Sequence, residues 1–262
     1  MTAFLDPATA LSTLKVTGPS FESYLQWMDD VRRRATLDLE TRSKQVFLDT
    51  KHYILRELTI RRYLKDAAVK KLQLGTGGNQ LDGWLNTDFF PNDRRVAFLD
   101  ATKKFPFEDQ TFDYIFTEHQ IEHITYPEGQ FMLAECFRVL KSGGRIRIAT
   151  PDLARLLSVY PKPEGMAQRY VEWITQKFIP EAPAPSPTFV VNCCMHLAGH
   201  RFVYDGPTLS EALSRVGFVG MERFEPSESR DPNLRGIDSH AVFTQDEDIN
   251  RFESMIFEAR RP

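Results

Sequence analysis

Five short apolar runs between Lys70 and Asp152 constrain the fold of this chain most. They read "KKLQLGTGGNQ", "GWLNTDFF", "RVAFLDAT", "FDYIFTEH" and "GRIRIATPD". Between the fourth and fifth, "EGQFMLAECFRVLKSGG" has apolar residues at helical spacing, and Gly143-Gly144 is expected to end that helix. Strands that alternate with helices predict parallel βαβ units and a doubly wound α/β fold.

The rest of the chain divides around this core. Residues 1–68 are expected to form a helical extension, with helices starting after Ser20 and spanning roughly residues 37–64. Residues 69–262 form the core domain, and residues 152–207, which include the proline-rich "PEAPAPSPT", form an insertion after the fifth strand. Thr208 is expected to cap a helix that Gly217 closes, and "FVGMERFE" and "SMIFEAR" predict two last strands, which makes seven.

Composition excludes several classes of protein. The formal net charge is −3, so no basic field attracts nucleic acid. The three cysteines form no C-x-x-C pair or disulfide framework, which suits a reducing compartment. We see no signal peptide and no apolar run of the roughly 18 residues that a membrane helix needs. We therefore expect a soluble, cytoplasmic protein with no nucleic-acid or membrane partner.

The ends of the first three strands carry groups suited to a nucleoside ligand. In "LGTGGN", Gly75, Gly77 and Gly78 let the backbone approach a bound group without a Cβ in the way. Asp88 ends the second strand, where an acid accepts hydrogen bonds from ribose, and Asp100 ends the third, where a carboxylate accepts from an amine. The P-loop pattern and a strict G-x-G-x-x-G are both missing, so a ligand without a pyrophosphate fits best.

Three segments in order carry a resemblance to a known family. They are "LQLGTGGNQLDGWLNTD", "FLDATKKFPFEDQTFDYIFTEHQIEHI" and "AECFRVLKSGGRIRIATPDL". Together they resemble the class I S-adenosylmethionine-dependent methyltransferases, and in particular the bacterial methyltransferase type 11 group. The resemblance is good over residues 70–157 and looser through "GHRFVYDGPTLSEALSRVGF" to the C-terminus. It implies a Rossmann-like, mostly parallel seven-stranded sheet and S-adenosyl-L-methionine as cofactor.

The resemblance also implies cofactor-binding roles at matching positions. Gly75 and Gly77, with Thr76 in place of the common cysteine, pass under the methionine part. Asp88 holds the ribose, and Asp100 with Ala101 holds the adenine. The methionine end is lined by Thr117 and Glu118, just after the fourth strand. The acid that the family often has two residues before the first glycine is here Gln73.

Methyl transfer from a sulfonium needs an aligned nucleophile and, for a hydroxyl, a base, but no metal. His119 follows the fourth strand and is the first candidate base, whereas His123 suits a structural role. "HLAGHRF" adds His196 and His200 as further catalytic candidates. The substrate-binding candidates are Arg201, Tyr204, Tyr126 and Asp152.

Other interpretations of the same residues stay open. His119, Glu122 and His123 match the H-x-x-E-H pattern of a zinc hydrolase, with His196 or His200 as a third ligand. A nicotinamide-dependent oxidoreductase shares the fold but needs a pyrophosphate cradle. A non-catalytic cofactor-binding module is a further alternative.

The acceptor is the least determined feature, because the fold does not select it. The resemblance and the long 152–207 segment favour methyl transfer to oxygen of a small molecule or sugar in biosynthesis. Transfer to nitrogen of a small molecule or peptide is the alternative. The apolar N-terminal helices are compatible with a homo-oligomer.

Overall fold

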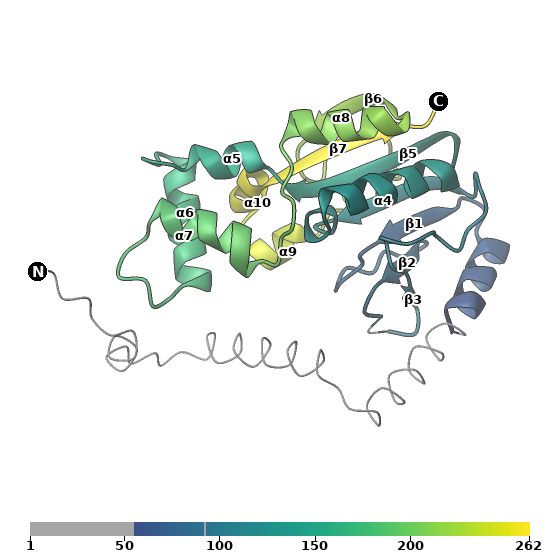
Figure 1. Cartoon of the computed structure of the whole chain (residues 1–262). Helices are drawn as coiled ribbons and strands as arrows, with labels where there is room; N and C mark the ends of the chain where they lie inside the picture. Colours follow the sequence, from purple (N-terminus) through teal and green to yellow (C-terminus); the bar gives the residue numbers. More distant parts are fainter. Residues whose placement is uncertain (1–54, 92) are drawn as a thin grey trace, which may run out of the picture.

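A mostly parallel seven-stranded sheet forms the centre of the protein (Figure 1). The computed structural model describes residues 55–91 and 93–262. The strand order is β3-β2-β1-β4-β5-β7-β6, and β7 runs antiparallel to both of its neighbours. The strands are β1 (Lys71–Leu74), β2 (Leu85–Asp88), β3 (Ala97–Phe98), β4 (Phe112–Glu118), β5 (Leu140–Pro151), β6 (Val219–Phe224) and β7 (Ser254–Arg260).

Helices precede the sheet and connect its strands. Residues 55–66 are helical and lead into β1. The others are η1 (Ile121–His123), α4 (Tyr126–Val139), α5 (Leu153–Ser158), α6 (Met166–Phe178), α7 (Pro187–Asn192), η2 (Cys193–Leu197), α8 (Gly206–Val216), α9 (His240–Thr244) and α10 (Glu247–Glu253). Among the described residues, no helix has the length and apolar character needed to span a bilayer.

The predicted α/β fold with seven strands is confirmed, with three local corrections. β4 extends through Thr117 and Glu118, which the sequence placed after it. α4 ends at Val139 rather than at Gly143-Gly144, because Leu140 already pairs with β4 as the first residue of β5. α8 is capped by Asp205, whose side chain accepts from the backbone N–H of Thr208. The helices predicted before residue 55 lie outside the described residues.

The two faces of the sheet are covered differently. α4 and α8, with Ile60 from the leading helix, bury one face together with inward side chains such as Leu72 and Ile115. On the opposite face, Phe116 packs with Trp84 and with Leu234, which belongs to the segment between β6 and β7. Alternate residues of β4 therefore enter two separate cores, as the period of a strand requires.

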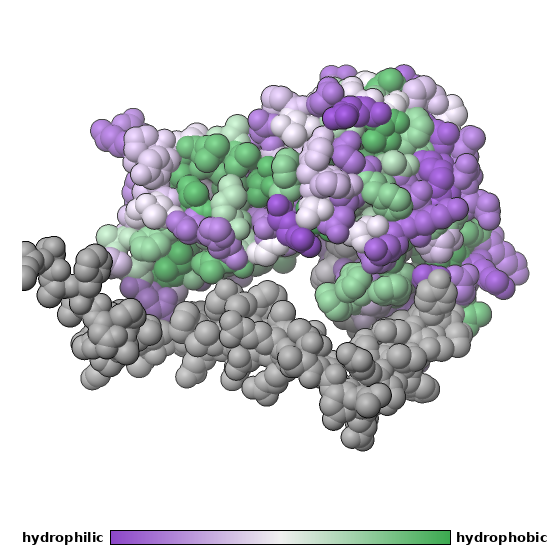
Figure 2. Space-filling model, in the orientation of Figure 1, coloured by the Kyte–Doolittle hydropathy of each residue, from purple (hydrophilic) through white to green (hydrophobic). Residues whose placement is uncertain are grey.

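The insertion after β5 builds a further core of its own. Buried side chains from α5, α6, α7 and η2 pack together with Ile249 of α10. Figure 1 shows these helices beside α9 and α10, beyond the end of the sheet. Figure 2 shows apolar surface over this part of the molecule. Leu157 and Tyr160 of this segment are exposed. The insertion is thus a helical lobe joined to the sheet by α10.

A buried arginine fastens the segment between β6 and β7 to the sheet. Arg147 of β5 donates from Nε to Asp238 over 2.9 Å and from a terminal nitrogen to Glu258 of β7 over 2.6 Å. All three side chains are almost inaccessible to solvent. Asp238 directly precedes the residues that enter the candidate site, so this contact fixes where they lie.

We expect Arg147→Ala to lower the free energy of unfolding by about 3–5 kcal/mol, because it leaves two carboxylates buried without their partner. Arg145→Ala is the matched control on the same strand. Arg145 is half-exposed and lies 3.5 Å from Asp231, so its removal should cost about 1 kcal/mol or less. Urea unfolding of both variants measures the difference, and equal losses would contradict the anchoring role of Arg147.

Candidate active site

A cavity of about 790 Å³ opens at the carboxyl edge of the sheet. β1 lies between β2 and β4, so the order of the strands reverses at β1 and β4, where doubly wound folds bind ligands. The loop after β1, the end of β4, the insertion helices and the segment before β7 all line the cavity. Its lining includes Gln73, Gly75–Asn79, Glu118, His119, Glu122, His123, Tyr170, Phe178, Cys193, Cys194, His200, Ser239, His240, Phe243 and Glu253.

The glycine loop has the shape of a cradle. Gly75 and Gly77 both have positive φ, +67° and +52°. A Cβ at Gly75 would lie 2.6 Å from Cγ of Gln120, whereas a Cβ at Gly77 or Gly78 would meet no atom within 4 Å. Asp88 supports the loop from β2, since its Oδ2 accepts from the Gly77 N–H over 2.8 Å. The loop therefore offers open space along its backbone, held in place by the acid of the next strand.

Two buried oxygen atoms near the loop have no hydrogen-bond partner among the described residues. Gln73 lines the cavity, and its Nε2 donates to the carbonyl of Asn79 while its Oε1 is unpaired. Thr117 is fully buried, and its hydroxyl is also unpaired. Buried polar atoms without partners are rare, and a bound group that donates hydrogen bonds satisfies them. The open cradle and the Gln73 acceptor therefore fit a ligand such as an amino acid moiety.

The other cofactor candidates have partners within the fold. Thr76 is buried, and its hydroxyl donates to the carbonyl of Thr87. Asp100 accepts from the backbone and side chain of Thr102, and Ala101 is buried in the core. Asp88, Asp100, Ala101 and Thr117 are not among the residues that line the cavity.

Glu118 anchors the segment that precedes α9. Its carboxylate accepts from the backbone N–H groups of Ser239 and His240 and from the Ser239 hydroxyl, over 2.8–3.0 Å. Asn79 of the glycine loop approaches the same carboxylate at 3.5 Å. Glu118 therefore joins the glycine loop, β4 and the segment before α9, a role that sequence reasoning did not assign to it.

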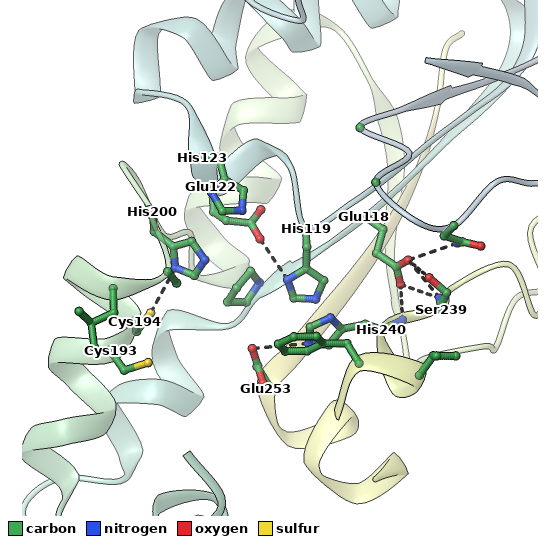
Figure 3. Close-up of a pocket in the computed structure, with 18 of the residues that line it drawn as sticks. Glu118, His119, Glu122, His123, Cys193, Cys194, His200, Ser239, His240 and Glu253 are labelled. Carbon is green, nitrogen blue, oxygen red and sulfur yellow. Dashed lines mark hydrogen bonds and ion pairs between the residues drawn. The ribbon is translucent and has the colours of Figure 1, made fainter. Parts of the chain in front are cut away.

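Both ring nitrogens of His119 have hydrogen-bond partners, and Figure 3 shows the one to Glu122. The backbone of His119 has φ +47°, a strained conformation for a residue other than glycine that is common at functional sites. Nδ1 lies 3.0 Å from Glu122 Oε1, and Nε2 lies 3.1 Å from the hydroxyl of Ser254. Ser254 donates its own proton to Asn250, so both nitrogens of His119 are placed as donors, which favours the charged imidazolium form.

The charges around His119 agree with this assignment. Burial opposes the charged ring, but the hydrogen bond and charge of Glu122, assisted by Glu253 and Glu118, raise the pKa of His119. Burial likewise opposes ionisation of Glu122, yet His119 lowers the pKa of this carboxyl. The two side chains thus form a buried ion pair, and His119 has no free nitrogen with which to take a proton.

The cavity also contains a histidine–carboxylate pair that sequence reasoning did not place in it. His240 stacks on His119, with 3.7 Å between ring centroids, and its Nε2 lies 3.6 Å from Glu253 Oε1. The His240 Nε2 and Glu253 Oε2 atoms are buried without a hydrogen-bond partner among the described residues. Burial opposes the charge of Glu253, but His240 and the other histidines lower its pKa. His240 is therefore a further candidate for proton transfer, and the carboxylate of Glu253 lies beside its ring.

The remaining candidates divide between the cavity and its surroundings. His200 lines the cavity, and burial lowers its pKa. His196 is exposed and is not among the lining residues. None of the four substrate candidates lines the cavity, namely Arg201, Tyr204, Tyr126 and Asp152. Asp152 instead caps α5 and pairs with Arg223, and Tyr204 packs in the core against Tyr126.

Comparison of the sequence with known protein families identifies a matching domain. The sequence profile of the family described as "Methyltransferase domain" matches residues 84–148, which is less than half of the chain. No curated protein matches the chain. Solved structures are also similar to the chain at low sequence identity.

One is an S-adenosylmethionine-dependent methyltransferase from Archaeoglobus fulgidus, at 17% identity and a TM-score of 0.42, covering 86% of this chain and 100% of that one. The N-methyltransferase NodS from Bradyrhizobium japonicum WM9 has 12% identity and a TM-score of 0.40, with coverage of 82% and 87%. Phosphoethanolamine N-methyltransferase 2 from Haemonchus contortus has 15% identity and a TM-score of 0.38, and this chain, matched over 79%, covers 52% of its length.

The matched profile runs from β2 into β5, and it includes Glu118, His119, Glu122 and His123 of the cavity lining. The match and the Rossmann-like fold are those expected of a class I S-adenosylmethionine-dependent methyltransferase. S-adenosyl-L-methionine is the methyl donor of this class.

We expect Glu122→Gln to lower the pKa of His119, because it removes the charge that stabilises the imidazolium. NMR titration of the ring measures this, and Glu247→Gln, at an exposed position of α10, is the control. The stabilisation from His119 is complete below its unfolded pKa and is lost as pH rises through the raised one. The stabilisation that ionised Glu122 contributes is lost as pH falls through its lowered pKa. The difference in free energy of unfolding between wild type and Glu122→Gln should thus be largest between the lowered pKa of Glu122 and the raised pKa of His119. An unchanged His119 titration would contradict the ion pair.

Proposed function

We propose that this methyltransferase transfers the methyl group to oxygen of a small-molecule or sugar acceptor. The observation that carries the proposal is the single cavity that joins the glycine loop to a set of histidine and carboxylate side chains. Its volume of about 790 Å³ lies in the range of small-ligand sites, roughly 300–1,000 Å³. A cofactor on the glycine loop therefore has its reactive end beside groups that can handle a proton.

The cofactor roles proposed from the sequence fit this geometry in part. The backbone of Gly75–Gly78 runs beneath the methionine part, and Gln73 Oε1 accepts from its ammonium group. Asp88 shares its oxygens between the Gly77 N–H and the ribose, and Asp100 with Ala101 lies toward the adenine. Thr117 offers its unpaired hydroxyl. We assign Glu118 to anchoring, because backbone and side-chain donors already occupy its carboxylate.

When bound, S-adenosylmethionine supplies a methyl group on a positively charged sulfur that a nucleophile can displace in line. His240 is the proposed base, because Glu253 lies 3.6 Å from its Nε2 and can stabilise the charge that the ring gains. His119 is a positioning residue, since it stacks on His240 and is fixed by Glu122 and Ser254. The insertion, residues 152–207, closes the acceptor end with Tyr170 and Phe178.

A second candidate is methyl transfer to nitrogen of an amine. Among the described residues, the lining contains three carboxylates, Glu118, Glu122 and Glu253, and no lysine or arginine. Such a wall disfavours acceptors that carry phosphate or carboxylate groups and suits uncharged or cationic ones. Mass spectrometry of products from a panel of hydroxylated and amino compounds distinguishes the two candidates by the atom that is methylated.

Cofactor binding is the first test. Calorimetry with S-adenosylhomocysteine should show saturable binding by the wild type. Asp88→Ala should weaken it roughly 10- to 100-fold, because it removes a charged hydrogen-bond acceptor worth about 1.5–3 kcal/mol. Asp88→Asn should give a smaller loss, since an acceptor for the Gly77 N–H remains. Asp82→Ala, at an exposed position of the same loop region, is the control. Failure of the wild type to bind would overturn the proposed function.

The base is tested separately. We expect His240→Gln to lower turnover roughly 10²- to 10⁴-fold, the usual contribution of a general base, with affinity for S-adenosylhomocysteine unchanged. His196→Gln, at the exposed histidine outside the lining, should leave both unchanged. Equal turnover of wild type and His240→Gln would remove His240 from the catalytic role.

A further inference from the structure

Three side chains on the insertion side of the cavity converge on one point. They are Glu122 and His123 from η1 and His200 from the segment after η2. One nitrogen from each histidine and one oxygen of Glu122 all lie within 4.8 Å of one another. The two rings meet edge to face, with centroids 5.0 Å apart and planes at 68°, so their in-plane lone pairs can point to a common position. Figure 3 shows the three side chains gathered together on the wall of the cavity.

Each of these side chains also has a contact with a neighbouring residue that orients it. His123 Nδ1 lies 3.4 Å from the carbonyl of Gly199, and His200 Nδ1 lies 3.6 Å from Sγ of Cys194. A ring that donates from Nδ1 keeps the lone pair of Nε2 free for a ligand bond. Glu122 is fully buried and accepts from His119 and from Thr150. Metal-binding histidines and carboxylates are typically oriented by such outer contacts.

We propose that Glu122, His123 and His200 bind a divalent metal ion of the zinc type within the cavity. Two imidazoles and one carboxylate are a ligand set for zinc and similar ions, and three protein ligands leave a position open to a small molecule. That position faces the same cavity as the glycine loop. The proposed site differs from the zinc-hydrolase pattern in the sequence, in which His119 is a metal ligand. Here His119 forms a hydrogen bond with Glu122 and does not bind the metal.

A second group of ligand-type residues fits a metal less well. His119, His240 and Glu253 also have atoms within 4.8 Å of one another. The two rings stack, however, with centroids 3.7 Å apart and planes only 22° apart. Lone pairs that lie in nearly parallel planes cannot both point at one ion, and both nitrogens of His119 are already bonded. This group is therefore better suited to proton transfer.

The role of the metal rests on the proposed function. The open position takes the acceptor hydroxyl, and the ion lowers its pKa. The hydroxyl proton passes to the imidazole ring of His240 as the oxygen–methyl bond forms. The bond between sulfur and methyl breaks, and sulfur keeps the electron pair as a neutral thioether. The acceptor class is thus a hydroxylated compound whose reacting oxygen can bind the ion.

The test uses untagged full-length protein that has been stripped with a chelator. Titration with Zn²⁺ against a chromogenic chelator should show one tight site per chain, and Co²⁺ should give visible absorption bands of low-coordinate cobalt. His123→Ala and His200→Ala should each weaken Zn²⁺ binding roughly 100-fold or more, the scale known for contacts of a metal site. His200→Gln repeats the test in case the smaller side chain disturbs folding, which thermal unfolding would reveal. His196→Ala is the control and should bind as the wild type does.

Absence of a saturable site in folded wild-type protein would overturn the inference, as would wild-type affinity in folded His123→Ala and His200→Ala. Metal binding is measured without cofactor, and binding of S-adenosylhomocysteine is measured without metal. If the cofactor product binds and Zn²⁺ does not, the metal site is wrong and the proposed function stands. If Zn²⁺ binds and the cofactor product does not, the metal site stands and the proposed acceptor chemistry fails.

Discussion

The carboxylate of Glu118 is the contact on which the candidate site depends most. It accepts hydrogen bonds from Ser239 and His240, and the neighbouring Asp238 is held by the buried Arg147. Three consecutive residues of the segment between β6 and β7 are thus fixed to β4 and β5. These contacts place the ring of His240 over the ring of His119. The position of His240 therefore depends on how its backbone is anchored more than on contacts of its own side chain.

The histidines of the cavity are chemically different although they lie close together. His119 pairs with a carboxylate and is charged, whereas burial lowers the pKa of His200 and favours its neutral form. His240 has an unpaired nitrogen beside Glu253. The surroundings of each histidine therefore determine its role. A nitrogen that donates a hydrogen bond, one that accepts a proton and one that binds a ligand each need a different neighbour.

Sequence patterns predicted the strands and the glycine loop because these depend on neighbours along the chain. Gly75 and Asp88 could be located since each comes at the end of an apolar run. Glu253 and Ser239 could not, because only long-range contacts bring the β6–β7 segment to the loop after β1. Nor did the sequence indicate that Glu118 binds the backbone of Ser239 and His240, that Asp152 caps α5, or that Tyr204 packs in the core. The H-x-x-E-H spacing showed that His119, Glu122 and His123 are near each other, but not which of them are partners.

The antiparallel direction of β7 has a consequence for how such a protein can change. β6 ends, and β7 begins, at the same edge of the sheet where β1 and β4 end. Residues added between β6 and β7 therefore arrive above the cavity without any strand changing its place or register. A new acceptor preference can be acquired by exchanging this one connection, while the sheet that binds the methyl donor is inherited intact.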